Sequence, residues 1–306
     1  MNGLKKQRLN RQPLIVNGFS RGGTNILMNL LLSHPDVVAP HGELHHVFKG
    51  GALNEKKMSG FYKKIFYDLP LKLMSGKDIF RRVSFWPRKI PNEIVLTYID
   101  WILYREKQKA TDESYNLWKN PANKYTKDEI ADSRLTFKAH DGLVFCNDIF
   151  RKMYPDARFV AIVRNGFAVC EGHIRRGYSV EKAAMRFTKT GEEIARNFSN
   201  PDYLCIKFED ILTEPLKSIQ SIYIHCGLDI NKCQYFRLQH KATVSANGKS
   251  ILKGDYDRQL EWYTPDEINR YFVSDVNKNQ ISRLTADEIN YLTKAIGPTM
   301  QKLNYL

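Results

Sequence analysis

The sequence predicts an α/β fold in which helices cover both faces of a central parallel sheet, forming three layers. Two observations predict it. Short, β-branched apolar runs alternate along the chain with longer segments whose apolar residues recur at helical spacing, a pattern typical of parallel sheets. In addition, the first run, PLIVNG, leads directly into a glycine-rich turn and a helix. With 306 residues, of which 42% are hydrophobic, the chain can bury a substantial core.

The individual elements follow from this alternation. The expected strands are residues 13–18, 36–40, 134–140, 158–163 and 203–208. The expected helices lie within residues 24–35, 56–74, 92–110, 142–155, 165–177, 179–198, 214–228 and 284–306. Asn92 and Thr285 suit helix starts, and Pro35 marks the end of the first helix. Because ligands bind at the carboxyl ends of parallel strands, the residues that follow these strands are the candidates for a site.

Two segments interrupt the alternation. Residues from about 49 to 134 are basic, aromatic and helical, which predicts an inserted helical lid. From about 235 to 306 the chain is polar and punctuated by turn residues before its final helix, which predicts a C-terminal cap. We therefore expect one domain over residues 1–306 that carries a single insertion.

The chain is strongly basic, with a formal net charge of +14 at pH 7. The charge is uneven, since residues 49–109 contain 14 Lys and Arg against 6 Asp and Glu. Net charge concerns association rather than fold, so this excess predicts an anionic partner. Polyanions, charged nucleotides and membrane surfaces all meet that description. Residues 49–109 are where we expect any peripheral contact with an anionic membrane.

The five cysteines are odd in number and form no C-x-x-C pair, which argues against a disulfide framework and against a zinc site. The N-terminus is basic but has no apolar stretch of signal-peptide length. No segment offers the roughly 18 uninterrupted apolar residues of a membrane-spanning helix. The sequence therefore predicts a soluble cytoplasmic protein without a bound metal.

The turn after the first strand has the spacing of a phosphate-binding loop. Gly18 and Gly23 meet the glycine positions of G-x-x-x-x-G-K-[ST], whereas Thr24 replaces the lysine and Asn25 replaces the residue whose hydroxyl binds magnesium. Backbone N–H groups at a helix N-terminus still favour an anion. Because a kinase or NTPase needs both Mg²⁺ and the lysine, the loop favours an anion that requires no metal, such as a phosphate that carries a sulfuryl group.

Three blocks, in order, resemble the sulfotransferases that use 3′-phosphoadenosine 5′-phosphosulfate (PAPS). The first, SRGGTNILMNLLLSHPDV followed by GEL, resembles their 5′-phosphosulfate loop and a downstream glutamate. The second, FKAHDGLVFCNDIFRKMYPDARFVAIVRNGFAVCEGHIRR, resembles the segment that binds the 3′-phosphate. The third, IKFEDILTEPLKSIQSIYIHCGL, resembles a V-x-Y-E-D-L signature. The blocks span residues 14–228, and the first is most similar to the carbohydrate and tyrosylprotein branches.

This resemblance implies a P-loop-like fold and a sulfotransferase activity. The donor would be PAPS, used without a metal, and the acceptor would be a hydroxyl on a carbohydrate-containing molecule such as a glycan or glycolipid. No nucleic acid partner is implied. The whole chain would then be one sulfotransferase domain.

By the same resemblance, Arg21 would neutralise the charge on the donor's oxygens as the P–O–S bond breaks. Gly22, Gly23, Thr24 and Asn25 would offer hydrogen-bond donors to the 5′-phosphate. The family usually has serine where this chain has Gly22, and threonine where it has Asn25. Backbone contacts survive both differences, but the hydroxyl at residue 25 is lost.

Glu43 would be the general base that takes the proton of the acceptor hydroxyl. The histidines His41, His45 and His46 remain alternatives, because the phenol and steroid branch uses histidine. Lys138 matches a lysine near the sulfate bridge in the tyrosyl branch, where it would stabilise charge on the leaving phosphate.

Arg164 would pair with the 3′-phosphate through its guanidinium. The family serine eight residues later is Gly172 here, which removes one hydroxyl donor. Phe208 replaces a tyrosine and would keep an aromatic face for the adenine. The family often closes a basic loop over the 3′-phosphate, and the candidates for it, among which the sequence does not choose, are Lys249, Lys253 and Arg258.

Two other functions remain open. A catalytically inactive protein that binds PAPS, its product 3′-phosphoadenosine 5′-phosphate (PAP) or a polyanion would contain the same blocks. The differences at Asn25 and Gly172 favour it, whereas Glu43 and Lys138 favour an enzyme. A small-molecule kinase of the P-loop type is disfavoured by Thr24 and Asn25.

Overall fold

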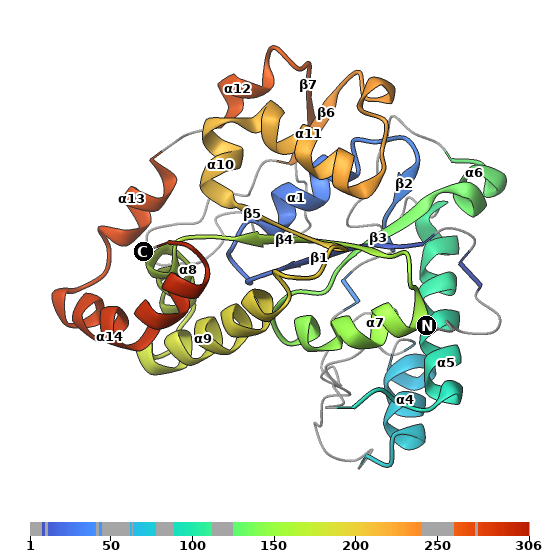
Figure 1. The fold of residues 1–306 in the computed structure, drawn as a ribbon, viewed down its shortest axis with the longest axis horizontal. Coiled ribbons are helices and arrows are strands. Elements are labelled where there is room, and N and C mark those ends of the chain that lie inside the picture. Colours follow the sequence, from blue (N-terminus) through green and yellow to red (C-terminus); the bar gives the residue numbers. More distant parts are fainter. Residues whose placement is uncertain are drawn as a thin grey trace. The chain divides into compact units, whose positions relative to one another are not determined.

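The computed structural model describes residues 8–9, 12–40, 43–44, 62, 64–77, 89–111, 125–239, 260–272 and 275–305 of the chain. At its centre is a parallel sheet with the strand order β2-β3-β1-β4-β5 (Figure 1). The strands are β1 (Leu14–Gly18), β2 (Val37–Val38), β3 (Arg134–Lys138), β4 (Arg158–Val163) and β5 (Tyr203–Lys207). Each lies within a strand expected from the sequence, and helices flank the sheet, so the predicted α/β class is confirmed.

The register of the sheet shows parallel pairing at both of its edges. Val37 of β2 lies opposite Arg134 of β3, and Phe159 of β4 lies opposite Tyr203 of β5. β1 and β3 are buried along their whole length, and β4 is buried beyond its first residue. Strands buried on both faces read as continuous apolar runs, which is why RFVAIV and LIV stand out in the sequence.

The chain divides into two compact units, the first of which comprises residues 1–15 and 35–158. Its helices are a π-helix (Lys64–Asp68), α4 (Leu69–Met74), α5 (Glu93–Gln108), a 3₁₀ helix (Lys109–Thr111), α6 (Lys127–Asp132), a second 3₁₀ helix (Asp141–Cys146) and α7 (Asn147–Met153). Asn92 caps α5 through its side chain, as expected. Buried polar side chains pair with one another: Tyr67 donates to Glu106 at 2.9 Å, and Tyr154 donates to Asp100 at 2.6 Å. The described part of residues 49–134 is thus helical, while the insertion boundaries stay a prediction.

The second unit comprises residues 16–34 and 159–306. Its helices are α1 (Thr24–Leu31), α8 (Gly166–Ile174), α9 (Val180–Arg196), α10 (Phe208–Thr213), α11 (Pro215–Cys226), a 3₁₀ helix (Ile230–Lys232), α12 (Ile268–Tyr271), α13 (Val276–Ile281) and α14 (Ala286–Lys302). Within this unit α1, α10 and α11 lie on one face of β4 and β5, and α8, α9 and α14 lie on the other (Figure 1). Thr285 and Glu288 form a capping box at the start of α14, where a helix start was expected.

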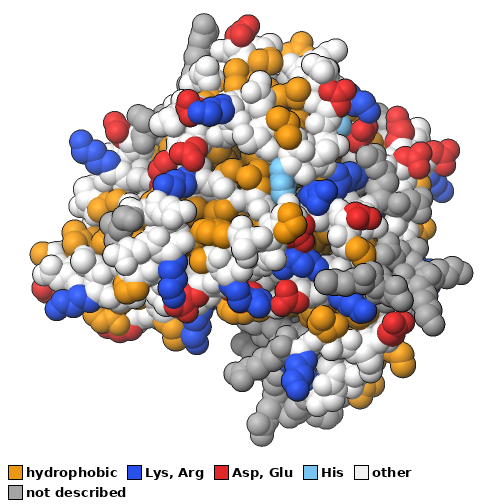
Figure 2. Space-filling model, viewed as in Figure 1, with side chains coloured by type: hydrophobic (Ala, Val, Ile, Leu, Met, Phe, Trp, Pro, Cys, Tyr) orange, Lys and Arg blue, Asp and Glu red, His pale blue; other side chains and the backbone are white. Residues whose placement is uncertain are grey.

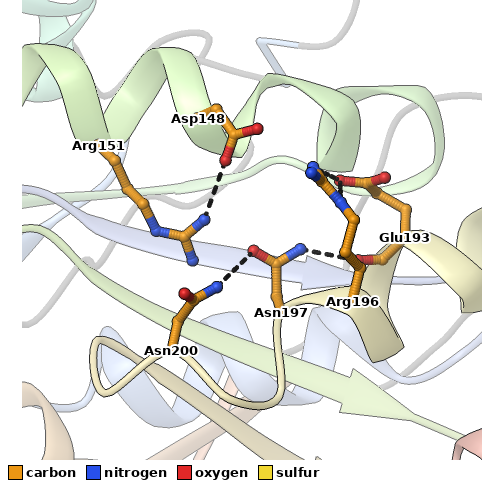
Figure 3. A network of polar contacts seen from close by, with 6 residues as sticks. All are labelled: Asp148, Arg151, Glu193, Arg196, Asn197 and Asn200. Atoms are coloured by element: carbon orange, nitrogen blue, oxygen red, sulfur yellow. Dashed lines mark hydrogen bonds and ion pairs between the residues drawn. The ribbon is translucent and has the colours of Figure 1, made fainter.

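Figure 3 shows how α9 ends. The buried side chain of Asn197 donates to the carbonyl oxygen of Glu193 at 2.7 Å and accepts a hydrogen bond from Asn200 at 3.3 Å. The carbonyls of a last helical turn lack intrahelical partners, so this amide satisfies one of them. The backbone N–H of Tyr203 then donates to the carbonyl of Asn200, which leads the chain from α9 into β5.

Several features were not expected from the sequence, among them the short helices α12 and α13. Residues Phe236–Gln239 (β6) and Leu260–Tyr263 (β7) form an antiparallel pair within the predicted C-terminal cap. The segment expected as one helix at 142–155 begins as a 3₁₀ helix, and a separate helix, α10, follows β5. Short strands with few β-branched residues and single helical turns produce too little periodicity to predict.

None of the helices in the described ranges is long and apolar enough to cross a membrane. Nor do these residues contain a group of three or more His, Cys, Asp or Glu that could hold a metal ion. On the face drawn in Figure 2, basic side chains lie next to acidic ones at several places.

Candidate active site

The glycine-rich turn joins β1 to α1 and is closed by backbone geometry. The N–H of Gly22 donates to the carbonyl of Phe19 at 2.9 Å, and the N–H of Ile26 donates to the carbonyl of Gly23 at 2.9 Å. Arg21 and Gly23 have φ values of 70° and 98°, in the left-handed region that glycine adopts without steric cost. A side chain at residue 23 could not be accommodated, because a Cβ there would lie 2.6 Å from the ring of Phe208.

Arg21 carries a positive charge and forms no ion pair with the residues that the structure describes. Its Nε atom is buried and has no hydrogen-bond partner. The stem of its side chain lies against Gly172 of α8, where a Cβ would be 3.1 Å from the Cβ of Arg21 and 3.2 Å from its Cγ. Burial lowers the pKa of Arg21, and so do the nearby charges of Arg176 and Arg175, whereas the charge of Glu171 acts in the opposite direction. A partly buried cation that lies near two other cations and has an unsatisfied buried donor is expected to bind an anion.

Arg164 follows the last residue of β4 and is 4% exposed. Its Nη1 donates to the backbone carbonyl of Arg21 at 3.0 Å, its Nε donates to Asn277 at 2.7 Å, and its Nη2 donates to Gln280. Burial lowers its pKa to about 10, against the opposing effect of Glu209. The guanidinium therefore remains charged at neutral pH and is fixed from three sides.

Phe208 begins α10 directly after β5 and is buried. The guanidinium of Arg164 lies over its ring at 4.3 Å from the centroid, a distance at which a cation is attracted to an aromatic face. The same ring fills the space beside Gly23. Phe208 thus supports both the turn and Arg164, and its contact with an adenine stays a prediction.

The structure brings together five of the residues that the sequence singled out in this unit. They form a chain of contacts in the order Gly172, Arg21, Arg164, Phe208 and Gly23. Gly22 lies in the same turn, and Thr24 is the first residue of α1. Asn25 follows it, and the backbone carbonyl of Asn25 accepts a hydrogen bond from the side chain of Asn29 at 2.9 Å. Their direct contacts with a donor stay a prediction.

In the first unit, Lys138 and Glu43 form an ion pair. Lys138 is the last residue of β3 and is 4% exposed, and its Nζ lies 2.8 Å from the Oε1 of Glu43, which is 24% exposed. The pair joins two residues that lie 95 positions apart in the sequence. The alternatives His41, His45 and His46 lie outside the described residues, as do Lys249, Lys253 and Arg258.

Sequence reasoning missed four polar residues around Arg164. Asn277 and Gln280 of α13 accept its hydrogen bonds, Asn277 also donates to Glu209, and Gln280 donates to Glu171 at 2.9 Å. The sequence could have indicated Glu209, because it is the glutamate of FED in the third block. Asn277 and Gln280 belong to no motif, so only the fold reveals them.

A comparison with protein families agrees with the motifs. Residues 132–232 match the model of the sulfotransferase family. No curated protein sequence matches the chain closely enough to report.

Solved structures of low identity align with most of the chain. The sulfotransferase domain of the olefin synthase of Synechococcus PCC 7002 is 15% identical, with a TM-score of 0.47, and the alignment covers 96% of this chain and 98% of that one. A mouse sulfotransferase, SULT7A1, complexed with PAP is 11% identical, with a TM-score of 0.43, and the alignment covers 99% of this chain and 95% of that one.

The family match contains Lys138, Arg164, Gly172 and Phe208, three of which meet at the site of the second unit. The predicted resemblance is thereby confirmed: over residues 132–232 this chain carries the sequence pattern of the sulfotransferase family.

Proposed function

We propose that this protein is a sulfotransferase that transfers the sulfuryl group of PAPS to a hydroxyl. The observation that carries the proposal is the buried, unpartnered Nε of Arg21, held in a phosphate-loop turn beside Arg164. An anion placed there would satisfy a buried donor that the described residues leave unsatisfied. Because Thr24 and Asn25 replace the lysine and the magnesium hydroxyl of nucleotide triphosphatases, a metal-free phosphosulfate fits better than a magnesium-bound triphosphate.

The residues of the second unit fit this donor. Gly22, Gly23, Thr24 and Asn25 would hold its 5′-phosphate at the start of α1, where the helix dipole favours negative charge. Arg21 would stabilise the charge that develops on the leaving phosphate, and the packing of its side-chain stem against Gly172 would limit the reorganisation that this requires. PAPS supplies an activated sulfuryl group.

Arg164 would hold the 3′-phosphate. A guanidinium suits phosphate because its N–H groups form a planar fork that matches two oxygens. The cation–π contact with Phe208 and the hydrogen bond to the carbonyl of Arg21 support this orientation. A lysine at this position would offer one point charge and could not make the same set of bonds.

Glu43 and Lys138 are proposed as the base and as a second positive group for the leaving phosphate. Lys138 supports Glu43 through a short ion pair, which would keep the carboxylate in place for proton removal. Glu43 retains access to solvent, as a base that meets an acceptor must. The histidines that neighbour it in sequence remain rivals for the role.

The acceptor is proposed to be a hydroxyl of a glycan or glycolipid, on the resemblance of the first block to the carbohydrate branch. In the first unit, the rings of Tyr98 and Trp101 stack with centroids 5.2 Å apart, and Phe66 and Leu73 are exposed within a segment whose sequence is rich in Lys and Arg. Aromatic rings can stack on sugars, and exposed apolar side chains beside Lys and Arg suit an anionic membrane surface. These features support a contact with such acceptors. We propose the cytoplasm as the location of the protein.

Thermal unfolding tests the donor. The protein is heated alone, with PAP, with PAPS and with Mg-ATP, since a ligand that binds only the folded state raises the melting temperature. We expect stabilisation by PAP and PAPS without metal and little effect of Mg-ATP. Incubation with ³⁵S-labelled PAPS and a panel of glycans and glycolipids then tests transfer. Indifference to PAP would contradict the proposed function, and PAP binding without transfer to any acceptor would favour an inactive binding protein.

A further inference from the structure

The guanidinium of Arg164 is embedded in a chain of five polar side chains, which we call the amide network: Glu209, Asn277, Arg164, Gln280 and Glu171. The Oδ1 of Asn277 accepts from Arg164, and its Nδ2 donates to Glu209. The Oε1 of Gln280 accepts from Arg164, and its Nε2 donates to Glu171 at 2.9 Å. Each amide thus presents its oxygen to the cation and its nitrogen to a carboxylate, the orientation that satisfies both of its ends.

The amide network holds Arg164 without a direct ion pair. Arg164 forms no ion pair with any residue that the structure describes, although two carboxylates lie one side chain away. Glu171 is itself paired with Arg175 and Arg283, at 3.6 Å and 3.4 Å. Neutral amides therefore stand between the guanidinium and both carboxylates, and they keep it from forming an ion pair with either one.

The amide network also leaves Arg164 with donors to spare. A guanidinium has five N–H groups. Arg164 uses three of them, one each for Asn277, Gln280 and the carbonyl of Arg21. Nε has a single N–H group, which Asn277 takes. The two N–H groups that remain are therefore one on Nη1 and one on Nη2. Two N–H groups are what bidentate recognition of a phosphate requires.

We infer that Asn277 and Gln280 are positioning residues that hold Arg164, without an ion pair and with two free N–H groups, for the 3′-phosphate of the donor nucleotide. This inference rests on the proposed function. It assigns to α13, which belongs to no recognised motif, the task of making nucleotide binding depend on the 3′-phosphate. Without the amides, Arg164 would be free to pair with Glu171 or Glu209 and its charge would be lost to the nucleotide.

The test compares two nucleotides that differ only in the 3′-phosphate, PAP and 5′-AMP. Their dissociation constants are measured by calorimetry for the wild type and for Asn277→Asp, which keeps the shape of the side chain but adds a carboxylate beside Arg164. Asn279→Asp is the matched control, because it places the same charge on the same helix at an exposed side chain. Asn277→Asp places a carboxylate opposite Glu209 and could fold poorly for that reason. Asn277→Leu is therefore the second variant, because it removes the amide without adding a charge.

We expect both variants at residue 277 to weaken PAP binding about tenfold or more, the loss typical of hydrogen bonds to charged groups, and to change 5′-AMP binding less than about twofold. Asn279→Asp should leave both nucleotides nearly unchanged. An equal loss for PAP and 5′-AMP would mean that residue 277 is merely structural, and tighter PAP binding would mean that α13 competes with the phosphate; either result overturns the inference. If the wild type binds neither nucleotide, the proposed function itself is wrong.

Discussion

Arg164 donates a hydrogen bond from Nη1 to the backbone carbonyl of Arg21 at 3.0 Å, joining the residue after β4 to the glycine-rich turn. The carbonyl belongs to a residue with a φ of 70°, a conformation that is uncommon for an arginine. The bond therefore supports the turn in the conformation that places the side chain of Arg21 against Gly172. The two arginines proposed to contact the two phosphorylated ends of the donor nucleotide are thus coupled.

Replacing Arg164 tests this coupling. In Arg164→Lys the charge remains, but an ammonium cannot keep all three of the present hydrogen bonds and still offer a fork to phosphate. We expect PAP affinity to fall about tenfold or more and the free energy of unfolding to fall by about 1–3 kcal/mol, because buried acceptors lose their donor. Calorimetry and chemical denaturation measure the two effects. An unchanged PAP affinity would mean that the 3′-phosphate lies elsewhere.

The pKa of Arg164 predicts how nucleotide binding depends on pH. Burial lowers that pKa to about 10, so the group is charged below pH 10 and loses its charge above it. A bound phosphate favours the charged form and raises the pKa again. PAP affinity should therefore be steady from pH 7 to about 9 and fall near pH 10, where binding takes up a proton. Titrations in buffers of different ionisation enthalpy measure this uptake, and proton release on binding would be the wrong sign.

The close contact between Gly172 and Arg21 explains why this chain lacks the serine of the family pattern. A side chain introduced at residue 172 should therefore weaken the site. Glycine within a helix ordinarily costs about 1 kcal/mol relative to alanine. In Gly172→Ala, however, the new Cβ would lie 3.1 Å from the Cβ of Arg21, near the root of that side chain where it cannot yield easily. We expect no gain in melting temperature and weaker binding of PAP.

Gly297→Ala is the matched control for that substitution. Gly297 also lies within a helix, α14, but a Cβ there would meet nothing within 4 Å. This variant should keep its PAP affinity, and it should gain little in the free energy of unfolding, because Pro298 disfavours a helical conformation for a residue with a Cβ before it and so offsets the better helix propensity of alanine. If Gly172→Ala behaved like Gly297→Ala in both measurements, the contact between Arg21 and residue 172 would not matter for the site.

The ion pair of the first unit separates catalysis from donor binding. Glu43→Gln keeps the size of the side chain but removes the base, so transfer of ³⁵S from PAPS should fall at least about a hundredfold, the lower end of the usual contribution of general base catalysis. PAP binding should stay nearly intact. Retained turnover would move the role of base to His41, His45 or His46, which can be replaced in turn.

Phe208 carries a prediction about stability. It is buried against Gly23 and beneath Arg164, so Phe208→Ala leaves a cavity at the centre of the site. We expect a loss of about 3–5 kcal/mol in the free energy of unfolding, measured by urea denaturation, and a loss of PAP affinity as the turn and Arg164 loosen. Phe208→Leu, which refills part of the space, should recover some stability but not the cation–π contact. Equal stability of Phe208→Ala and the wild type would show that the ring is not packed as described.

Much of this arrangement could be predicted from the sequence because it depends on local patterns. The strands of the parallel sheet are continuous apolar runs, and Gly22 and Gly23 indicate the turn between β1 and α1. The proximity of Arg21, Arg164 and Phe208 followed from the rule that sites form at the carboxyl ends of parallel strands. The resemblance to the family identified which residues are the candidates for the site.

The rest depends on contacts between segments that are distant in the sequence. The fit of Arg21 against Gly172 turns a missing serine into a steric requirement, which no local pattern encodes. Asn277 and Gln280 are ordinary polar residues of a short helix, and only the fold places them on Arg164. The pairing of β6 with β7 is likewise a long-range contact between short strands.

Calorimetric titration of PAP into the metal-free protein, in the presence of EDTA, tests the central claim most directly. The comparison is between the wild type, Arg21→Gln and Arg196→Ala, an exposed arginine at the end of α9 whose loss also removes one positive charge. The account predicts saturable binding without metal, weakened about tenfold or more by Arg21→Gln and nearly unchanged by Arg196→Ala. Absence of PAP binding without a metal, or equal binding by all three proteins, would contradict it.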